Sequence, residues 1–133
     1  MTNVLFSNGR EGFLDGSIDW DTNDVRIMLV KSTYVFDDTD KFLSDLGSVD
    51  NGRSAALTSK TVTGGVADAA DTTITATSAV ACNALIAFQH TGSDSTARLI
   101  AYIDTATGLP VTPAANGVVN VAWDNGSNKI FKL

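Results

Sequence analysis

The acidic side chains between Asp19 and Asp24 are the first candidates for chemistry in this sequence. Asp19, Asp21 and Asn23 alternate as the first oxygen ligands of a calcium-binding loop do. The sixth position of such a loop needs a glycine for its sharp turn, and here it is Asp24. The twelfth position needs a bidentate Glu, and here it is Val30. We therefore interpret the segment as a turn with solvated carboxylates and expect no metal site.

The other residue types that could support catalysis lack partners. Asp37, Asp38 and Asp40 could act as general acid and base if burial separated their pKa values, but their neighbours are typical of an exposed loop. The only histidine, His90, lies in a polar stretch, and no G-x-S-x-G motif occurs. The only cysteine, Cys82, adjoins an apolar run, which favours a structural role. One Cys and one His cannot complete a zinc site, so we expect neither an enzyme nor a cofactor.

The charge of the chain argues against nucleic acid and membranes as partners. Fifteen acidic and nine basic residues give a net charge of −6 at pH 7, and the basic residues are scattered singly. Such a surface repels phosphate backbones and anionic lipids on average. No apolar run has the length of a membrane helix, and the first residues lack the pattern of a signal peptide. We expect a protein that is made in the cytoplasm and folds without disulfides.

Length and composition predict one all-β domain over residues 1–133. The chain is 44% hydrophobic and 18% charged, which is typical of a folded globule. Nearly all acidic residues are Asp, and Thr, Ser and Gly are abundant, which favours turns and strands over helices. We predict an antiparallel β-sandwich or barrel of about seven to nine strands with one or two short helical turns.

The expected strands differ in how far they are buried. Val25–Lys31 alternates and predicts a half-buried strand. Ala84–Phe88 and Leu99–Ile103 are apolar on both faces and predict central strands joined as an antiparallel hairpin. Thr-rich stretches predict exposed or edge strands, and an Asn-Gly turn precedes the expected terminal strand. These further strands are expected at Lys60–Thr63, Thr72–Thr77, Gly117–Trp123 and Lys129–Leu133.

Two short helical turns are expected between these strands. The first covers Asn8–Asp15, with Ser7 or Asn8 as its N-cap and Gly16 at its end. The second covers Asp40–Leu46 and stops at the following glycine. Neither helix is long enough to organise the fold.

The apolar surplus predicts contact with other chains. In so small a domain, strands that are apolar on both faces need an outer cover, which a closed homo-oligomer, most simply a trimer, would supply. The uncharged residues 1–7 could add an extended N-terminal arm that packs on a neighbour and is loose in the free protein. The candidate interface residues are Val4, Leu5, Phe6, Ile100 and Tyr102.

Three segments of the chain resemble short virion structural proteins of tailed bacteriophages and prophages. They are GREGFLDGSIDWDTNDVRIMLV from Gly9, SKTVTGGVADAADTTITA from Ser59 and RLIAYIDTATGLPVTPAANGVVNVAWDNGSNKIFKL from Arg98. The resemblance implies a β-rich capsid decoration, or cement, protein that binds the major capsid protein in many copies. It would clamp adjacent capsomers against the pressure of packaged DNA on the surface of the virion. No catalytic residues carry over.

Two other functions remain open at this point. A tail or neck structural protein of the same particle would assemble into rings or tubes. A small carbohydrate-binding β-sandwich would instead expose a planar aromatic strip, for which Trp20, Tyr34 and Phe36 are the only close set.

Overall fold

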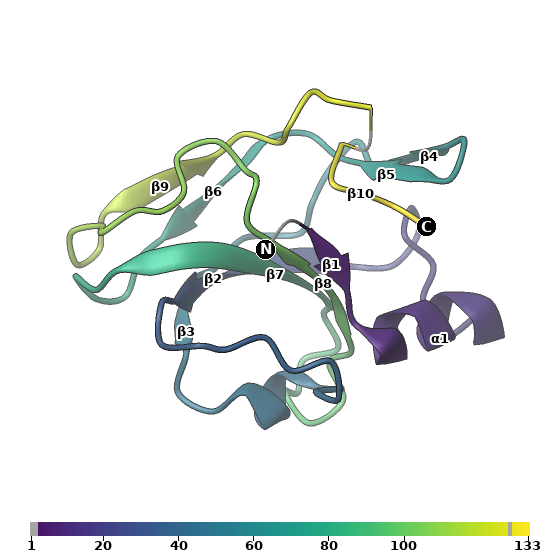
Figure 1. Cartoon of the computed structure of the whole chain (residues 1–133), viewed down its shortest axis with the longest axis horizontal. Helices are drawn as coiled ribbons and strands as arrows, with labels where there is room; N and C mark the ends of the chain where they lie inside the picture. The colour runs from purple at the N-terminus through teal and green to yellow at the C-terminus, as the bar shows by residue number, and fades with distance from the viewer. Residues whose placement is uncertain (1–2, 128) are drawn as a thin grey trace.

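Antiparallel strands dominate the structure, a computed structural model that describes residues 3–127 and 129–133. The described residues form ten strands in three open sheets, together with one short helix and one 3-10 turn (Figure 1). The predicted all-β class is confirmed, and no barrel closes within the described ranges. The strands are β1 (Val4–Leu5), β2 (Val25–Lys31), β3 (Asp50–Arg53), β4 (Thr61–Thr63), β5 (Val66–Asp68), β6 (Thr72–Thr75), β7 (Cys82–Gln89), β8 (Leu99–Ile103), β9 (Val118–Val121) and β10 (Phe131–Lys132).

The main sheet has the strand order β1-β8-β7-β2-β3. β7 lies at its centre and pairs along its length with β2 on one side and β8 on the other. The predicted hairpin between β7 and β8 is confirmed, as are the bounds of β2 and β8. The apolar runs predicted β7 and β8 because these strands are covered on both faces, whereas β2 was predicted from the alternation in Val25–Lys31.

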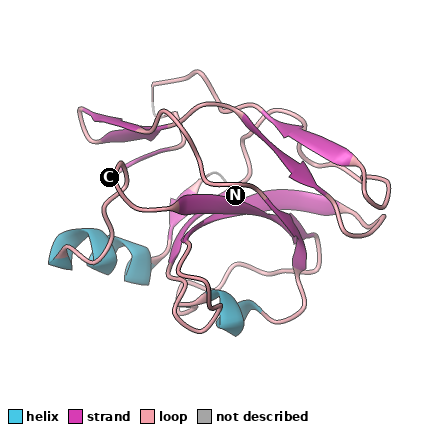
Figure 2. Cartoon of the chain, turned by 180° about the vertical axis from the view of Figure 1, so that it is seen from behind, coloured by secondary structure: helices cyan, strands magenta, loops and turns pink. Residues whose placement is uncertain are grey.

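Two smaller sheets cover one face of the main sheet. Their orders are β6-β9 and β10-β5-β4, and they lie above the main sheet in Figures 1 and 2. The core on this side contains Ile27, Leu29, Ile74, Leu85 and Val121, together with other buried side chains. The smaller sheets and the main sheet therefore form a sandwich, as predicted from sequence.

The opposite face of the main sheet is covered by irregular chain. Residues 32–49, called here the covering segment, contain the 3-10 turn η1 (Leu43–Leu46) and lie below the main sheet (Figure 2). Leu43 and Leu46 pack with Met28, Ile86 and Phe88 from the sheet. The prediction that β2 is half-buried is thus wrong, since Met28 is as buried as Ile27.

Helix α1 (Ser7–Asp15) confirms the predicted first helix but not its cap. The N-cap residue is Phe6, and no side chain caps the helix, whereas Gly16 ends it in the left-handed conformation as predicted. Gly9 is the point of closest approach to β8, since a Cβ there would lie 2.7 Å from the carbonyl oxygen of Ile100. A glycine at this point lets the helix backbone contact the strand.

The pairing of the C-terminal strands differs from the simple return predicted across the Asn-Gly turn. β9 pairs with β6, and β10 pairs with β5, so the two strands belong to different sheets. Three strands were not predicted: β1, β3 and β5. β5 follows β4 directly through Gly64 and Gly65, which form a two-residue turn with positive φ at both positions.

Candidate functional site

The five predicted interface residues lie mostly inside the protein. Val4 pairs with Tyr102, and Leu5 pairs with Ala101, so this part of the predicted arm is strand β1 of the main sheet. Leu5, Phe6, Ile100 and Tyr102 are 4%, 0%, 0% and 7% exposed, and Val4 is partly exposed. Within the single chain these positions offer little exposed apolar surface, because the covering segment and the smaller sheets cover both faces of the main sheet. Residues 1–2 of the predicted arm lie outside the described residues.

The three residues of the predicted aromatic strip lie on opposite sides of the main sheet. Trp20 is buried beneath the smaller sheets, and its indole N–H donates to the carbonyl oxygen of Asp68. Tyr34 and Phe36 pack instead among the side chains on the side of the covering segment. The planar exposed platform that a sugar ring would need does not form from these residues.

The acidic side chains of residues 19–24 and of residues 37–40 form hydrogen bonds within local turns and with neighbouring segments. In the first, the Asp19 N–H donates to Asn23 Oδ1 at 2.7 Å, which closes a turn. In the second, the Tyr34 hydroxyl donates to Asp40 Oδ2 at 2.9 Å, and burial raises the pKa of Tyr34. Asp38 accepts hydrogen bonds from the N–H and hydroxyl of Ser7 at the start of α1. Across residues 3–127 and 129–133, no three His, Cys, Asp or Glu side chains gather in a way that could hold a metal ion.

Cys82 is buried and contacts Asn51 of β3, which forms a small cluster of polar contacts. Asn51, which is fully buried, donates from Nδ2 to Cys82 Sγ at 3.2 Å. Its Oδ1 accepts from the Thr77 hydroxyl and from the Ser78 N–H and hydroxyl. Burial raises the pKa of the Cys82 thiol, which favours its protonated form.

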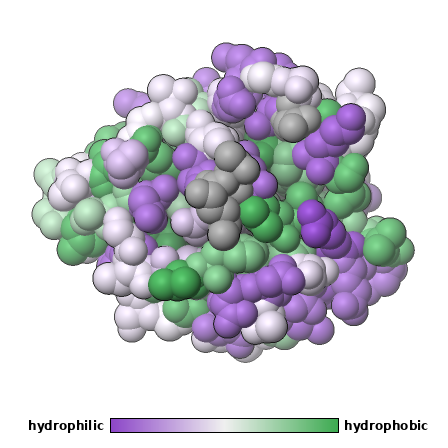
Figure 3. All heavy atoms as spheres, viewed as in Figure 1, coloured by the Kyte–Doolittle hydropathy of each residue, from purple (hydrophilic) through white to green (hydrophobic). Residues whose placement is uncertain are grey.

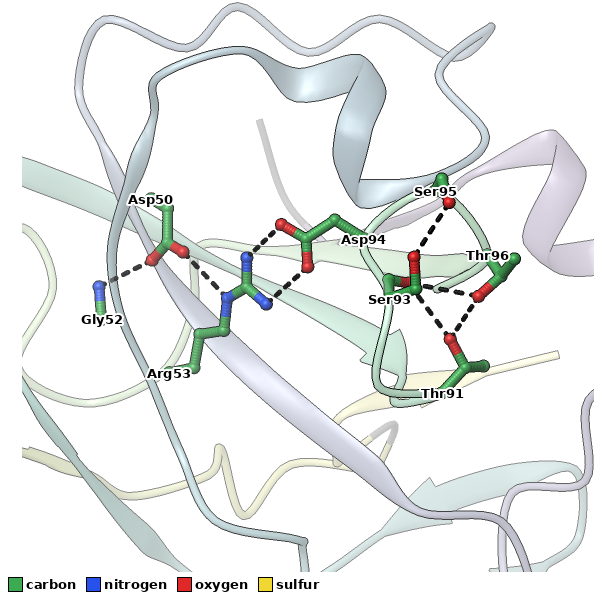
Figure 4. A network of polar contacts seen from close by, with 8 residues as sticks. All are labelled: Asp50, Gly52, Arg53, Thr91, Ser93, Asp94, Ser95 and Thr96. Atoms are coloured by element: carbon green, nitrogen blue, oxygen red, sulfur yellow. Dashed lines mark hydrogen bonds and ion pairs between the residues drawn. The ribbon is translucent and has the colours of Figure 1, made fainter.

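Arg53 organises the main polar network on the surface (Figure 4). Its guanidinium forms two hydrogen bonds with Asp94, at 2.8 and 2.9 Å, while its Nε donates to Asp50 at 2.8 Å. It also lies over the Phe88 ring, 5.5 Å from the centroid. These contacts fasten the loop between β7 and β8 to the edge strand β3. Hydrogen bonds of that loop among Thr91, Ser93, Ser95 and Thr96 hold its shape.

The pair of Arg53 and Asp94 is expected to make stability depend on pH. The Arg53 hydrogen bonds lower the pKa of Asp94 from its ordinary value of 3.8. A lowered pKa in the folded state adds stability above pH 4, and this stability is lost as the pH falls through the folded-state pKa. Both side chains are partly exposed, so the pair contributes at most about 1 kcal/mol.

A double-mutant cycle in urea, with Arg53→Gln and Asp94→Asn, measures this contribution. We expect a coupling free energy of about 0.5–1 kcal/mol at pH 7 that declines as the pH falls through the lowered folded-state pKa of Asp94. A coupling that stays equal from pH 7 down to the acidic end of the folded range would contradict the assignment. The cycle cancels the separate contacts of Arg53 with Asp50 and Phe88.

The surface also holds an apolar groove between α1 and the β10-β5-β4 sheet, with a volume of about 430 Å³. Its floor is a row across the sheet, in which Val62 pairs with Ala67 and Ala67 pairs with Phe131. In Figure 3, hydrophobic side chains lie among hydrophilic ones on the side of the molecule where α1 and the β4–β5 hairpin lie. The lining residues are Phe13, Gly16, Ile18, Asp19, Trp20, Asp21, Val62, Gly65, Ala67, Phe131 and Leu133.

The groove is the best candidate binding surface on the described part of the chain. Val62 and Leu133 are 55% and 58% exposed and both line it, so exposed apolar side chains from two parts of the chain gather at one hollow, as they do at protein contact sites. Sequence reasoning missed the groove, because Val62 lies in a Thr-rich stretch and Leu133 ends the chain. The one available signal was the alternation around Val62, which placed it on one face of an exposed strand.

Comparison with known proteins returned no relatives. No protein-family model matches the chain, and neither a curated protein nor a solved structure matches it. In residues 3–127 and 129–133, no helix is long and apolar enough to cross a membrane.

Proposed function

We propose that this chain is a structural protein of a tailed-phage virion, and that it acts as a decoration protein on the head. The exposed apolar groove between α1 and the β10-β5-β4 sheet carries the proposal, since its chemistry suits contact with another protein. The resemblance of the three sequence segments supplies the virion setting. The partner is then the major capsid protein, and binding of many copies reinforces the shell against the pressure of packaged DNA.

The fold supports a mechanical role of this kind. The main sheet is covered on both faces, and Arg53 and Asn51 connect its edge to neighbouring loops. The acidic surface keeps free copies apart in solution before they bind.

The test is to remove the protein from DNA-filled particles and then add back the full chain. We expect it to bind heads to saturation and to raise the temperature at which DNA is released. Separately purified tails serve as the matched comparison. Binding to tails without binding to heads would favour the tail or neck alternative, and binding to neither would contradict a virion role.

The trimer stays a prediction, and the structure removes the observation on which it was based. It rested on an apolar surplus in β7 and β8, and those side chains are buried within the chain. Sedimentation of the free protein at several concentrations measures the oligomeric state directly. The carbohydrate-binding alternative receives no support from the positions of Trp20, Tyr34 and Phe36.

A further inference from the structure

We propose that the apolar groove binds an extended, basic segment of a partner protein, which adds as a fourth strand to the free edge of β4. The proposal concerns how this surface recognises its partner, and it holds whether or not the partner is a capsid protein. Three features carry it: the open edge, the row of side chains beside that edge and the acidic rim.

The edge of β4 is open and correctly oriented. β4 pairs only with β5 among the described residues, and Thr61, Val62 and Thr63 are all exposed. In a hairpin with a two-residue turn, the two residues beside the turn exchange backbone hydrogen bonds with each other. Hydrogen-bonded and non-hydrogen-bonded pairs then alternate along the strands, so the next pair, Val62 and Ala67, exchanges no backbone hydrogen bonds. The Ala67 carbonyl accordingly accepts from Ile130 on the opposite side. The N–H and C=O of Val62 therefore point to the open edge.

A strand added at this edge would continue the floor of the groove. The row of Phe131, Ala67 and Val62 crosses three strands in register on one face. Successive side chains of a strand alternate between faces, so every second side chain of a fourth strand would lie on this face beside Val62. An apolar side chain there would cover the exposed part of Val62 and extend the apolar row by one strand. Strand addition of this kind takes affinity from main-chain hydrogen bonds and specificity from alternate side chains.

The rim of the groove indicates the charge of the occupant. Asp19 and Asp21 both line the groove and are exposed. The pKa of Asp21 is raised, first by a side-chain hydrogen bond with Asp19 and then by desolvation and by the Asp19 charge, whereas the charge of Lys60 lowers it. The two carboxylates therefore lie in contact on the rim, and a Lys or Arg side chain on the bound segment would add a favourable charge contact with them. A second copy of the chain is disfavoured as the occupant, because each copy carries a net charge of −6 and the same acidic rim.

Three blocked synthetic peptides and the full-length protein provide the test. The first peptide alternates Val and Thr over eight residues and carries a Lys near each end. The second replaces each Lys by Glu, and the third keeps the side chains of the first but has N-methylated backbone amides. The readouts are the NMR amide shifts of the protein and the hydrogen exchange of the Val62 amide.

We expect the Lys peptide to bind with a Kd below about 1 mM and to shift the amide signals of Val62, Gly65 and Leu133. At a free peptide concentration of ten times Kd, exchange at Val62 should slow about tenfold, since only the free protein exchanges. The Glu peptide and the N-methylated peptide should each bind at least about fivefold more weakly.

Protein variants separate the groove from other apolar surface. Val62→Lys should weaken binding of the Lys peptide at least about tenfold. Val118→Lys is the matched control, since Val118 is 64% exposed on β9 of the other small sheet, and it should not change binding. Asp21→Asn should weaken the Lys peptide about two- to fivefold and leave the Glu peptide no weaker.

Four results would overturn the proposal. One is the absence of shifts at Val62 with 1 mM Lys peptide, and another is equal binding of the N-methylated peptide, which would exclude strand addition. Equal binding of the Glu peptide would exclude the inferred charge. Protection of the Val62 amide without peptide, together with concentration-dependent dimers, would show that a second copy is the occupant.

Discussion

Phe6→Ala is expected to lower the free energy of unfolding by about 3–5 kcal/mol, the usual range for removing a buried Phe side chain. Phe6 is 0% exposed, and its ring centroid lies 5.0 Å from that of Phe36 in the covering segment. Its N–H donates to the carbonyl oxygen of Ile100, and it is the N-cap residue of α1. The substitution therefore leaves a cavity where the N-terminal segment, the main sheet and the covering segment meet. Urea denaturation measures the change.

Leu14→Ala is the matched control for this experiment. Leu14 lies in α1, whose N-cap residue is Phe6, but its side chain is 86% exposed. Removal of that side chain should therefore change the free energy of unfolding by less than about 0.5 kcal/mol. A loss below about 1 kcal/mol for Phe6→Ala would mean that the N-terminal segment is undocked in the free protein, as the loose-arm interpretation of the sequence implies. Deletion of residues 1–7 should destabilise the fold at least as much as Phe6→Ala.

Gly52→Ala is expected to destabilise the protein by about 3 kcal/mol or more. Gly52 has a φ of +125°, a conformation that L side chains rarely adopt. A Cβ at this position would also lie 2.4 Å from the carbonyl oxygen of Thr75. Backbone strain and steric overlap each contribute about 1–3 kcal/mol in such cases. Thermal and urea unfolding both measure the loss, which arises where β3 meets the end of β6.

Gly16→Ala separates the two contributions. Gly16 also has a positive φ, of 82°, but nothing lies within 4 Å of a Cβ at this position. It should therefore show only the conformational cost, about 1–2 kcal/mol. If Gly52→Ala were no more destabilising than Gly16→Ala, the close contact between Gly52 and Thr75 would not exist in solution.

Strands with continuous apolar or alternating patterns could be predicted from sequence, including the Thr-rich β4 and β6, whereas β1, β3 and β5 could not. β8 has the predicted bounds because burial on both faces demands apolar residues at every position, and β2 has them because its alternation marked a strand even though its burial was underestimated. β3 has the sequence Asp-Asn-Gly-Arg, which is typical of a turn. It forms a strand because Asn51 finds buried hydrogen-bond partners and Gly52 allows close contact with β6, and these are tertiary effects.

The candidate site was harder to predict from sequence than the strands, because it depends more on tertiary structure. The predicted interface residues were selected for being apolar near an apolar sheet, but the covering segment buries Phe6 and Tyr102 from the other side. Its turn-rich sequence gave no sign that it would act as a layer of the core. The groove was missed because only the folded chain brings its residues together. Its residues come from three distant parts of the chain, and none of the local patterns indicates that they meet.

The strand order of the main sheet also affects how the chain folds during synthesis. β1 is synthesised before its partner β8, and six other strands lie between them in the sequence. Until β8 has been made, β1 has no strand to pair with, and α1 has no surface at Gly9 to dock against. The side chains of Leu5 and Phe6 lack their cover from β8 over this interval, when apolar segments are open to chaperones and to aggregation. The long-range pairing of β1 with β8 is therefore expected to be a late step in folding.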